Sequence, residues 1–326
     1  MEVYIYKLKF KGSTHFGETG IDLENVSEWV NSDTLFSAII NAMSQFNQKD
    51  DVSEFVNIFK KNPPFLLSSL FVYYNNFQFL PRPMDDYHLS DEIRRKKTKE
   101  LKRIKWLTLD SFKKRMGEGQ LSEDDISIME SEQSEYRDAF TIEIRPRVSL
   151  DRTTHNSNIY HSGFVYFKKD AGLYGLVAFR DSLPVEQFKK LLNGLGETGL
   201  GGEKTYGCGM FEVVNFEKVS GVLKEILECK VSKYTLLSLY HPNEEEKANL
   251  ASSFIAYDIT RKRGWITSGR YALPLKRKSV GFVTEGSVSG NPLKGTLVDV
   301  TPDNPREILS HRVYRYGYAF TAPLGS

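Results

Sequence analysis

Seven glycines within residues 194–211 constrain the fold of this chain more than any other feature of its sequence. The segment reads Gly-Leu-Gly-Glu-Thr-Gly-Leu-Gly-Gly-Glu-Lys-Thr-Tyr-Gly-Cys-Gly-Met-Phe. Glycine adopts backbone conformations that other residues avoid, so this density of glycine favours a loop. Pro184 and Gly194 bound a pattern typical of a short helix, and a strand is predicted at 210–216. The segment is therefore expected to link a helix to a strand.

That order of elements helps to decide between three interpretations of the loop. The letters Gly194-x-Gly196-x-x-Gly199 match a dinucleotide fingerprint, which needs a preceding strand and a following helix. A P-loop needs glycine before Lys204, where Glu203 stands. The third interpretation is a loop whose backbone approaches a phosphodiester, and we favour it over a flexible turn without a ligand. Its binding residues would be Gly199, Gly201, Gly202, Lys204, Thr205, Gly207 and Gly209.

The remaining pattern of the first 218 residues alternates between strands and helices. Strands are expected at 2–10, 140–148, 160–167 and 173–179, and a helix with an apolar stripe begins at Ser32 as its N-cap. This order fits a ferredoxin-like α+β unit at 1–218, with an insertion at about 85–138. A second, smaller unit is expected at 219–326. Its predicted strands are 234–240, 271–275, 281–284, 295–300 and 312–321.

The strand at 140–148 begins a predicted hairpin arm with two different faces. Period-two alternation places Ile142, Ile144 and Val148 on one face, and Arg145 and Arg147 on the other. Arg152 follows in the polar tip. The arginines could bind RNA, or Arg147 and Arg152 could pair within the arm with Glu143 and Asp151.

The nearly neutral charge balance, 44 basic against 42 acidic residues, hides segregation along the chain. Basic residues crowd 94–105, interpreted as a solvated helix face, and acidic residues crowd 118–138, interpreted as a mobile insertion or a docking surface. A second basic stretch is interrupted by the aromatic residues Trp265 and Tyr271 and consists of Arg261, Lys262, Arg263, Arg270, Lys276, Arg277 and Lys278. Basic and aromatic groups combine in this way on nucleic-acid surfaces, although a plain solvated loop and strand fits equally.

Hydropathy and cysteine content restrict the cellular setting. No run of about eighteen apolar residues occurs, so we expect neither a membrane span nor a membrane partner. The start alternates lysine with apolar residues instead of building a signal-peptide core. Cys208 and Cys229 fit a reducing compartment, and the chain is expected to be cytoplasmic.

The glycine-rich loop, placed between the last helix and the last strand of a ferredoxin-like unit, resembles the signature of the RAMP superfamily of CRISPR RNA-binding proteins. Four further segments, in order along the chain, resemble the family of fourth Csm subunits of type III-A effector complexes. They are Leu-Lys-Phe-Lys-Gly at 8–12 running to His-Phe-Gly-Glu at 15–18, Asn-Ser-Asp-Thr-Leu-Phe-Ser-Ala at 31–38, Arg-Val-Ser-Leu-Asp-Arg at 147–152, and Val-Tyr-Arg-Tyr-Gly at 313–317 with Ala-Phe-Thr at 319–321. The family often has histidine where Asn31 stands, and Asn31 can hydrogen-bond a phosphate or sugar but carries no charge.

This resemblance implies a non-catalytic subunit with two ferredoxin-like domains that grips the repeat-derived 5′ tag of crRNA. The subunit would contact the adjacent crRNA-backbone RAMP subunit and the large polymerase-like subunit, without a cofactor and without direct DNA contact. The arm at 147–154 would act as a thumb near the guide. Besides the glycine-rich loop, the expected RNA-binding residues are His15, Ser32, Asp33, Thr34, Arg145, Arg147, Arg152, Arg261, Lys262 and Arg263.

Two alternative functions stay open at this point. His15 lies where some relatives carry a histidine for metal-free, guide-processing RNA cleavage, but nothing in the spacing selects Tyr4, Tyr6 or Lys7 as its partner. The other alternative is a protein-interaction scaffold with little RNA contact, using apolar residues within 65–79 that more often fill a core. The dispersed histidines and unpaired cysteines predict no metal site. We therefore expect a protein that is not an enzyme.

Overall fold

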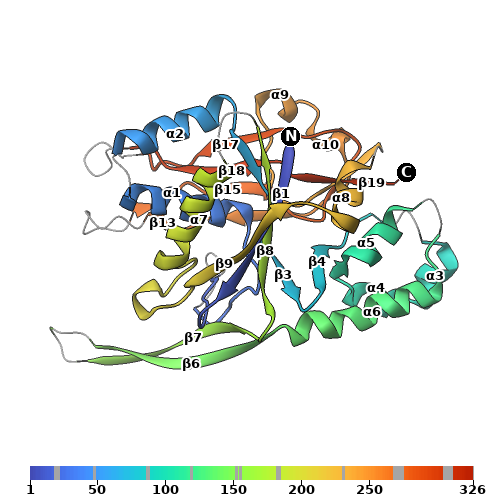
Figure 1. The fold of residues 1–326 in the computed structure, drawn as a ribbon, viewed down its shortest axis with the longest axis horizontal. Coiled ribbons are helices and arrows are strands. Elements are labelled where there is room, and N and C mark those ends of the chain that lie inside the picture. Colours follow the sequence, from blue (N-terminus) through green and yellow to red (C-terminus); the bar gives the residue numbers. More distant parts are fainter. Residues whose placement is uncertain are drawn as a thin grey trace.

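The computed structural model describes residues 1–17, 23–46, 49–85, 89–117, 120–150, 153, 156–180, 185–229, 232–266, 275–303 and 311–325, which form a mixed α+β fold (Figure 1). Three sequence predictions involve residues outside these ranges: the RNA contact of Arg152 with its alternative partner Asp151, the helix start at Pro184, and most of the strand predicted at 271–275.

The largest sheet in the described ranges has seven antiparallel strands, in the order β5-β4-β3-β8-β1-β9, with β2 also beside β8. β1 lies between β8 and β9 and pairs Tyr6 with Gly175 on one side and Phe216 on the other. Every residue of β8 is buried, as expected for a central strand. The strands predicted at 2–10, 173–179 and 210–216 are confirmed. The seven strands are β1 Glu2–Phe10, β2 Phe65–Leu67, β3 Phe71–Tyr74, β4 Phe77–Pro81, β5 Trp106–Thr108, β8 Ala171–Phe179 and β9 Phe211–Lys218.

Helices α1 Ser32–Phe46, α2 Lys49–Lys61 and α7 Val185–Thr198 meet this sheet through an aromatic core. Ring centroids of Phe59 lie 5.0 Å from those of Phe36 and 4.9 Å from those of Phe65, and Phe188 of α7 lies 4.9 Å from Phe65. Burying each phenylalanine contributes about 1.5–3 kcal/mol. The apolar stripe of α1 is thus a core stripe. Ser32, predicted as the N-cap, is instead the first helical residue.

The end of α7 corrects a second sequence prediction. Gly194 was expected to close this helix, but α7 continues through Gly194 and Gly196 to Thr198. A Cβ at position 196 would lie 2.5 Å from the carbonyl oxygen of Phe211, so glycine there allows the helix to pack closely on β9. The residue that follows the helix, Gly199, has a φ of +83°, which suits the end of a helix.

The insertion forms four ordered helices beside the β5 edge of the sheet, at the lower right of Figure 1. Its basic and acidic halves pair: Lys96 lies 3.3 Å from Glu123, and Arg103 lies 3.3 Å from Glu130. A capping box at Ser122 starts α6, which buries apolar side chains against the sheet. The described residues 123–138 therefore form a regular helix, and the two interpretations of the acidic segment, a mobile insertion or a docking surface, stay predictions. The helices are α3 Asp91–Lys96, α4 Thr98–Arg103, α5 Leu109–Met116 and α6 Glu123–Asp138.

The predicted arm is a long antiparallel hairpin of β6 Phe140–Leu150 and β7 Ser157–Phe167, which extends away from the body of the molecule (Figure 1). Its register pairs Arg147 with Tyr160. The apolar face beyond the hairpin base is uncovered, with Ile144 57% and Val148 58% exposed. The strand predictions for both segments are confirmed.

The C-terminal part contains a four-stranded sheet in the order β11-β16-β10-β19 and three two-stranded ladders. The strand predicted at 312–321 is divided, because β18 pairs with β17 whereas β19 pairs with β10. The sheet consists of β10 Lys233–Leu236, β11 Phe254–Ala256, β16 Val288–Ser289 and β19 Thr321–Leu324. The ladders pair β12 Ile259–Lys262 with β15 Val280–Val283, β13 Trp265–Ile266 with β14 Leu275–Lys276, and β17 Gly295–Asp299 with β18 Tyr314–Tyr318. The helices are α8 Gly221–Glu228, α9 Glu244–Lys247 and α10 Leu250–Ser253.

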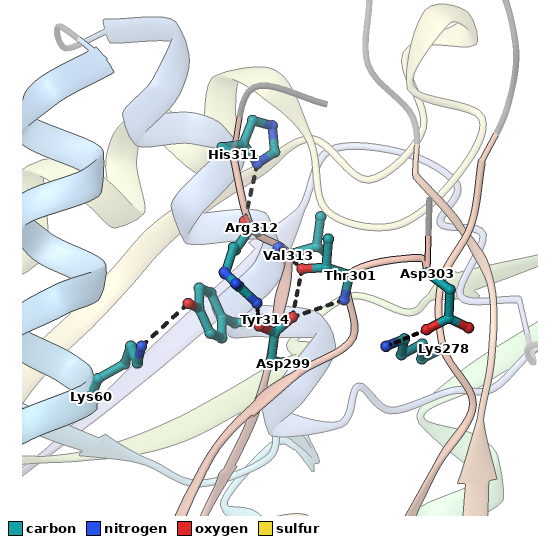
Figure 2. Close-up of polar contacts among 9 residues, drawn as sticks. All are labelled: Lys60, Lys278, Asp299, Thr301, Asp303, His311, Arg312, Val313 and Tyr314. Atoms are coloured by element: carbon teal, nitrogen blue, oxygen red, sulfur yellow. Dashed lines mark hydrogen bonds and ion pairs between the residues drawn. The ribbon is translucent and has the colours of Figure 1, made fainter. Parts of the chain in front are cut away.

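Polar contacts at the end of the β17–β18 ladder fix the approach to β18 (Figure 2). The Asp299 carboxylate accepts hydrogen bonds from the Thr301 amide at 2.9 Å and from Arg312 Nη1 at 2.6 Å. Nearby, Lys60 Nζ lies 3.3 Å from the Tyr314 hydroxyl, which links α2 to β18.

The N- and C-terminal parts share one continuous hydrophobic core. The Tyr316 hydroxyl accepts a hydrogen bond from the Leu67 amide at 2.8 Å, and Ser69 N donates to the Leu237 carbonyl at 2.8 Å. The predicted boundary between 1–218 and 219–326 therefore lies between two parts of the chain that pack closely against each other.

Candidate nucleic-acid interface

A groove of about 680 Å³ brings together segments that are far apart in the sequence. The loop after β1, the start of α1, the glycine-rich loop and the β12–β13 strands all line it. Of the predicted RNA-binding residues, the groove is lined by His15, Asp33, Thr34, Gly201, Gly202, Lys204, Arg261, Lys262 and Arg263. The residues that do not line it are Ser32, Arg145, Arg147, Gly199, Thr205, Gly207 and Gly209.

Close packing explains much of the glycine content of the loop. At Gly209, which has φ +79°, a Cβ would lie 2.0 Å from the Leu200 carbonyl oxygen. At Gly201, which has φ +99°, a Cβ would lie 2.6 Å from the His15 carbonyl oxygen. The same His15 oxygen accepts a hydrogen bond from the Gly202 amide at 2.8 Å. The glycine-rich loop is thus tied to the loop after β1, and contact of its backbone with phosphate stays a prediction.

His15 lies at the junction of these two loops and is only 5% exposed. Its Nδ1 donates a hydrogen bond to the Gly163 carbonyl oxygen over 2.8 Å, because a carbonyl can only accept. The neutral ring then carries its acceptor at Nε2, close to Gly17. This geometry gives His15 an ordering role between the loops and the base of the hairpin.

Three RNA-binding residues were predicted at the start of α1, and only one of them is exposed. Ser32 and Asp33 have no exposed surface, whereas Thr34 is exposed on the groove. The Ser32 hydroxyl accepts a hydrogen bond from the Leu239 amide at 3.1 Å. The Asp33 carboxylate accepts from Arg315 Nη1 and, at 3.2 Å, from the Tyr316 amide. Ser32 and Asp33 therefore fasten α1 to the C-terminal part.

A chain of hydrogen bonds, partly buried, positions Lys262, the middle residue of the basic segment 261–263. Lys262 Nζ donates to Asn31 Oδ1 over 2.5 Å, and Asn31 Nδ2 donates to Glu285 Oε1 over 3.1 Å. The Ser69 hydroxyl also donates to Glu285. Burial raises the pKa of Glu285, although the hydrogen bonds and Lys262 oppose this. Asn31 thus connects a cation on the groove to a buried carboxyl.

The hairpin arginines lie beside the glycine-rich loop and outside the groove lining. The guanidinium carbon of Arg147 lies 4.3 Å from the ring centroid of Tyr206, which belongs to the 3-10 turn Lys204–Tyr206. Arg145, and not Arg147, pairs with Glu143 at 2.8 Å. The expected alternative partner of Arg147 is therefore wrong, and Arg147 instead stacks on an aromatic ring.

Sequence reasoning missed several groove residues. Trp265 was noted only as an aromatic neighbour, and Arg277 only as part of a basic stretch, but both line the groove. Glu285 and Arg315 were not singled out, because one charged residue within a strand pattern gives no signal of burial. Burial lowers the pKa of Lys204, which also lines the groove.

Comparison with known proteins shows similarity to Csm4 proteins. A family model described as the CRISPR Csm4 C-terminal domain matches residues 230–324. A CRISPR system Cms protein Csm4 from Thermococcus onnurineus (strain NA1) is 29% identical over 307 residues, covering 90% of each chain. A second, from Methanocaldococcus jannaschii, is 23% identical over 377 residues and covers 99% of this chain and 97% of the relative. The chain is thus similar to Csm4 proteins over most of its length, and its C-terminal part matches the Csm4 model.

Solved Csm4 structures share the fold over the full length of the chain. The crystal structure of a Csm3-Csm4 subcomplex in the type III-A CRISPR-Cas interference complex matches with a TM-score of 0.64 at 18% identity, covering 100% of both chains. A Csm1-Csm4 cassette in complex with pppApA matches with a TM-score of 0.59 at 22% identity, covering 99% of this chain and 98% of that chain. The α+β organisation seen here is therefore the Csm4 fold.

Two further observations bear on the site and its surroundings. Among the described residues, no group of three or more His, Cys, Asp or Glu side chains is arranged to hold a metal ion. In the same part of the chain, no helix combines the length and apolar character needed to cross a membrane.

Proposed function

We propose that this chain is the Csm4 subunit of a type III-A CRISPR Csm complex and that it holds the 5′ tag of crRNA in the groove. The groove is the observation that supports this proposal, because it is lined both by the basic segment 261–263 and by the glycine-rich loop. Its basic lining residues are Lys204, Arg261, Lys262, Arg263, Arg277 and Arg315. Its two lining carboxylates, Asp33 and Glu285, are buried and hydrogen-bonded within the protein. The groove therefore presents positive charge to a phosphate backbone.

The hairpin is assigned the role of a thumb near the guide, with Arg145, Arg147 and Arg152 as its RNA contacts. The strand order β9-β1-β8 with β2 and β3, together with α1 and α7, supports a ferredoxin-like unit at 1–218. A second unit of the same kind is proposed at 219–326. Relatives of this fold were solved as Csm3-Csm4 and Csm1-Csm4 assemblies, which supports contacts with an adjacent backbone subunit and with the large subunit.

The proposed subunit is cytoplasmic and non-catalytic. Tyr6 cannot reach an RNA hydroxyl, because it is fully buried and burial raises its pKa far above the usual value. Lys7 lies on β1 and lines a different pocket, and it does not line the groove. His15 thus has neither of these groups as an acid partner. Metal-free incubation with repeat RNA is expected to leave the RNA intact, and site-specific cleavage that His15→Ala abolishes would contradict this assignment.

The direct test of the proposal is salt-dependent binding of an unpaired, tag-bearing RNA to the full chain. Affinity is expected to fall steeply with salt, and the double variant Arg261→Met/Arg263→Met should reduce both affinity and salt slope. The matched control is Lys99→Met/Lys102→Met, which removes the same charge from exposed positions of the insertion. Equal behaviour of the two double variants would contradict the groove. Binding of partner subunits without any RNA affinity would favour a protein-interaction scaffold.

A further inference from the structure

Arg277 is a cation in the groove lining that forms no ion pair with any of the described residues. It follows β14, and its amide donates to the Gly264 carbonyl oxygen over 2.9 Å, which fixes its backbone beside the β12–β13 bend. Its side chain is partly buried and makes no salt bridge within the described part of the chain. The Nε atom is shut off from solvent and has no hydrogen-bond partner.

A second guanidinium lies close by and offers Arg277 no compensation. Arg315 is 5% exposed, and it donates through Nη1 to Asp33 and through Nη2 to the Arg263 carbonyl oxygen at 2.6 Å. Its own Nε is also buried and unpaired. Asp33 is fully engaged, since it also accepts from the Tyr316 amide. Two cations therefore share one carboxylate at this end of the groove.

The direction of the pKa shift of Arg277 agrees with this excess of positive charge. Burial lowers the pKa of Arg277, and the positive charge of Arg315 lowers it further, whereas Asp33 acts in the opposite direction. A partly buried charge without a partner destabilises a folded protein. A bound anion that neutralises the charge of Arg277 would explain why this arrangement is kept.

This inference rests on the proposed function. We propose that Arg277, with Arg315 beside it, forms a binding site for one particular phosphodiester of the bound RNA. A phosphate accepts several hydrogen bonds from guanidinium groups at once. Phosphate is favoured over a carboxylate of a partner protein because further basic residues, including Arg263 and Lys204, line the same groove. That arrangement suits a chain of phosphates better than one acidic side chain.

The first test is the thermal stability of the full chain without RNA. Arg277→Met removes an uncompensated charge but keeps an apolar stem, so its Tm is expected to rise above that of the wild type. Arg261→Met is the control, because Arg261 is exposed and its removal should leave Tm nearly unchanged. A Tm of Arg277→Met clearly below the wild type would show that Arg277 has a structural partner, and would overturn the proposal.

The second test locates the phosphate. Unpaired RNA with a single neutral methylphosphonate at each linkage in turn is titrated against the wild type, which should lose affinity about tenfold or more at one linkage. Arg277→Met should bind unmodified RNA more weakly by a similar factor and lose that dependence on position. Arg261→Met should weaken binding yet keep the position-specific loss.

The possible outcomes distinguish the proposed phosphate site at Arg277 from RNA binding by the groove in general. Two results would rule out the phosphate site and leave the proposed function intact. In the first, no methylphosphonate linkage weakens binding to the wild type; in the second, the linkage that weakens it also weakens binding to Arg277→Met. Unimpaired RNA binding by Arg277→Met with lost binding of a partner subunit would assign Arg277 to a protein carboxylate, which also rules out the phosphate site. Absence of RNA binding by the wild type would refute the proposed function itself.

Discussion

The guanidinium carbon of Arg147 lies 4.3 Å from the ring centroid of Tyr206, and this contact joins the hairpin to the glycine-rich loop. Tyr206 is 64% exposed, so the pair lies at the surface. A cation–π contact at such a site contributes about 0.5–1 kcal/mol. The arm is therefore held beside the loop by a weak contact that RNA could rearrange.

Arg147→Ala and Tyr206→Ala are expected to show a coupling energy of about 0.5–1 kcal/mol in a double-mutant cycle of unfolding free energy. Tyr206→Phe, which keeps the ring, should retain most of the coupling. A coupling energy of zero, or full loss with Tyr206→Phe, would mean that the ring stacking contributes nothing.

Glu285 gives the stability of the protein a specific dependence on pH. Because burial raises its pKa in the folded state, the folded chain holds this proton more tightly than the unfolded chain does. The free energy of unfolding contributed by Glu285 should therefore fall as the pH rises from the usual glutamate range through the raised pKa. Glu285→Gln should remove this fall and still accept hydrogen bonds from Ser69 and Asn31. Superimposable Tm-against-pH curves for wild type and variant would contradict the shift.

Two glycines with similar backbone conformations but different surroundings test the packing of the loop. Gly207 has φ +77° and open space around its Cα, whereas a Cβ at Gly209 would meet the Leu200 carbonyl oxygen. Gly207→Ala is expected to reduce the unfolding free energy by about 1 kcal/mol, and Gly209→Ala by about 3 kcal/mol or more. Chemical denaturation measures both. Equal losses would show that the close approach at Gly209 is relaxed without cost.

Trp265 is expected to supply a stacking surface for an unpaired base in the groove. Its side chain is 55% exposed, and Lys276 Nζ lies 5.4 Å from its ring centroid. Trp265→Ala should weaken binding of unpaired RNA by about 1–3 kcal/mol with an unchanged salt slope, since no phosphate contact is lost. Tyr257→Ala is the control, because Tyr257 is similarly exposed at 51% but does not line the groove. Equal affinities of the two variants would exclude stacking on Trp265.

Local patterns predicted the main elements well, because two-residue alternation marks the hairpin strand 140–150 even though its apolar face is exposed, and burial imposes a 3.6-residue period on α1. The end of α7 could not be predicted, since Gly194 and Gly196 look like stop signals until the close contact with Phe211 is known. The split between β18 and β19 depends on two different partner strands, which a single segment does not reveal.

The candidate site was predicted in parts but not as a whole. The glycine-rich loop and residues 261–263 each carried a composition signal, but their meeting in one groove depends on how the N- and C-terminal parts pack. Asp33 shows the limit of sequence reasoning: it was expected to contact RNA, and the structure pairs it with Arg315, far along the chain. Sequence spacing does not encode such a contact.

The most direct test of the central claim is ultraviolet crosslinking of a tag-bearing, unpaired RNA to the full chain, followed by mass spectrometry of the attached peptides. The account predicts crosslinks from one RNA to peptides of the loop after β1, of 201–206 and of 260–265. Crosslinks confined to the insertion helices or other surfaces outside the groove would contradict it.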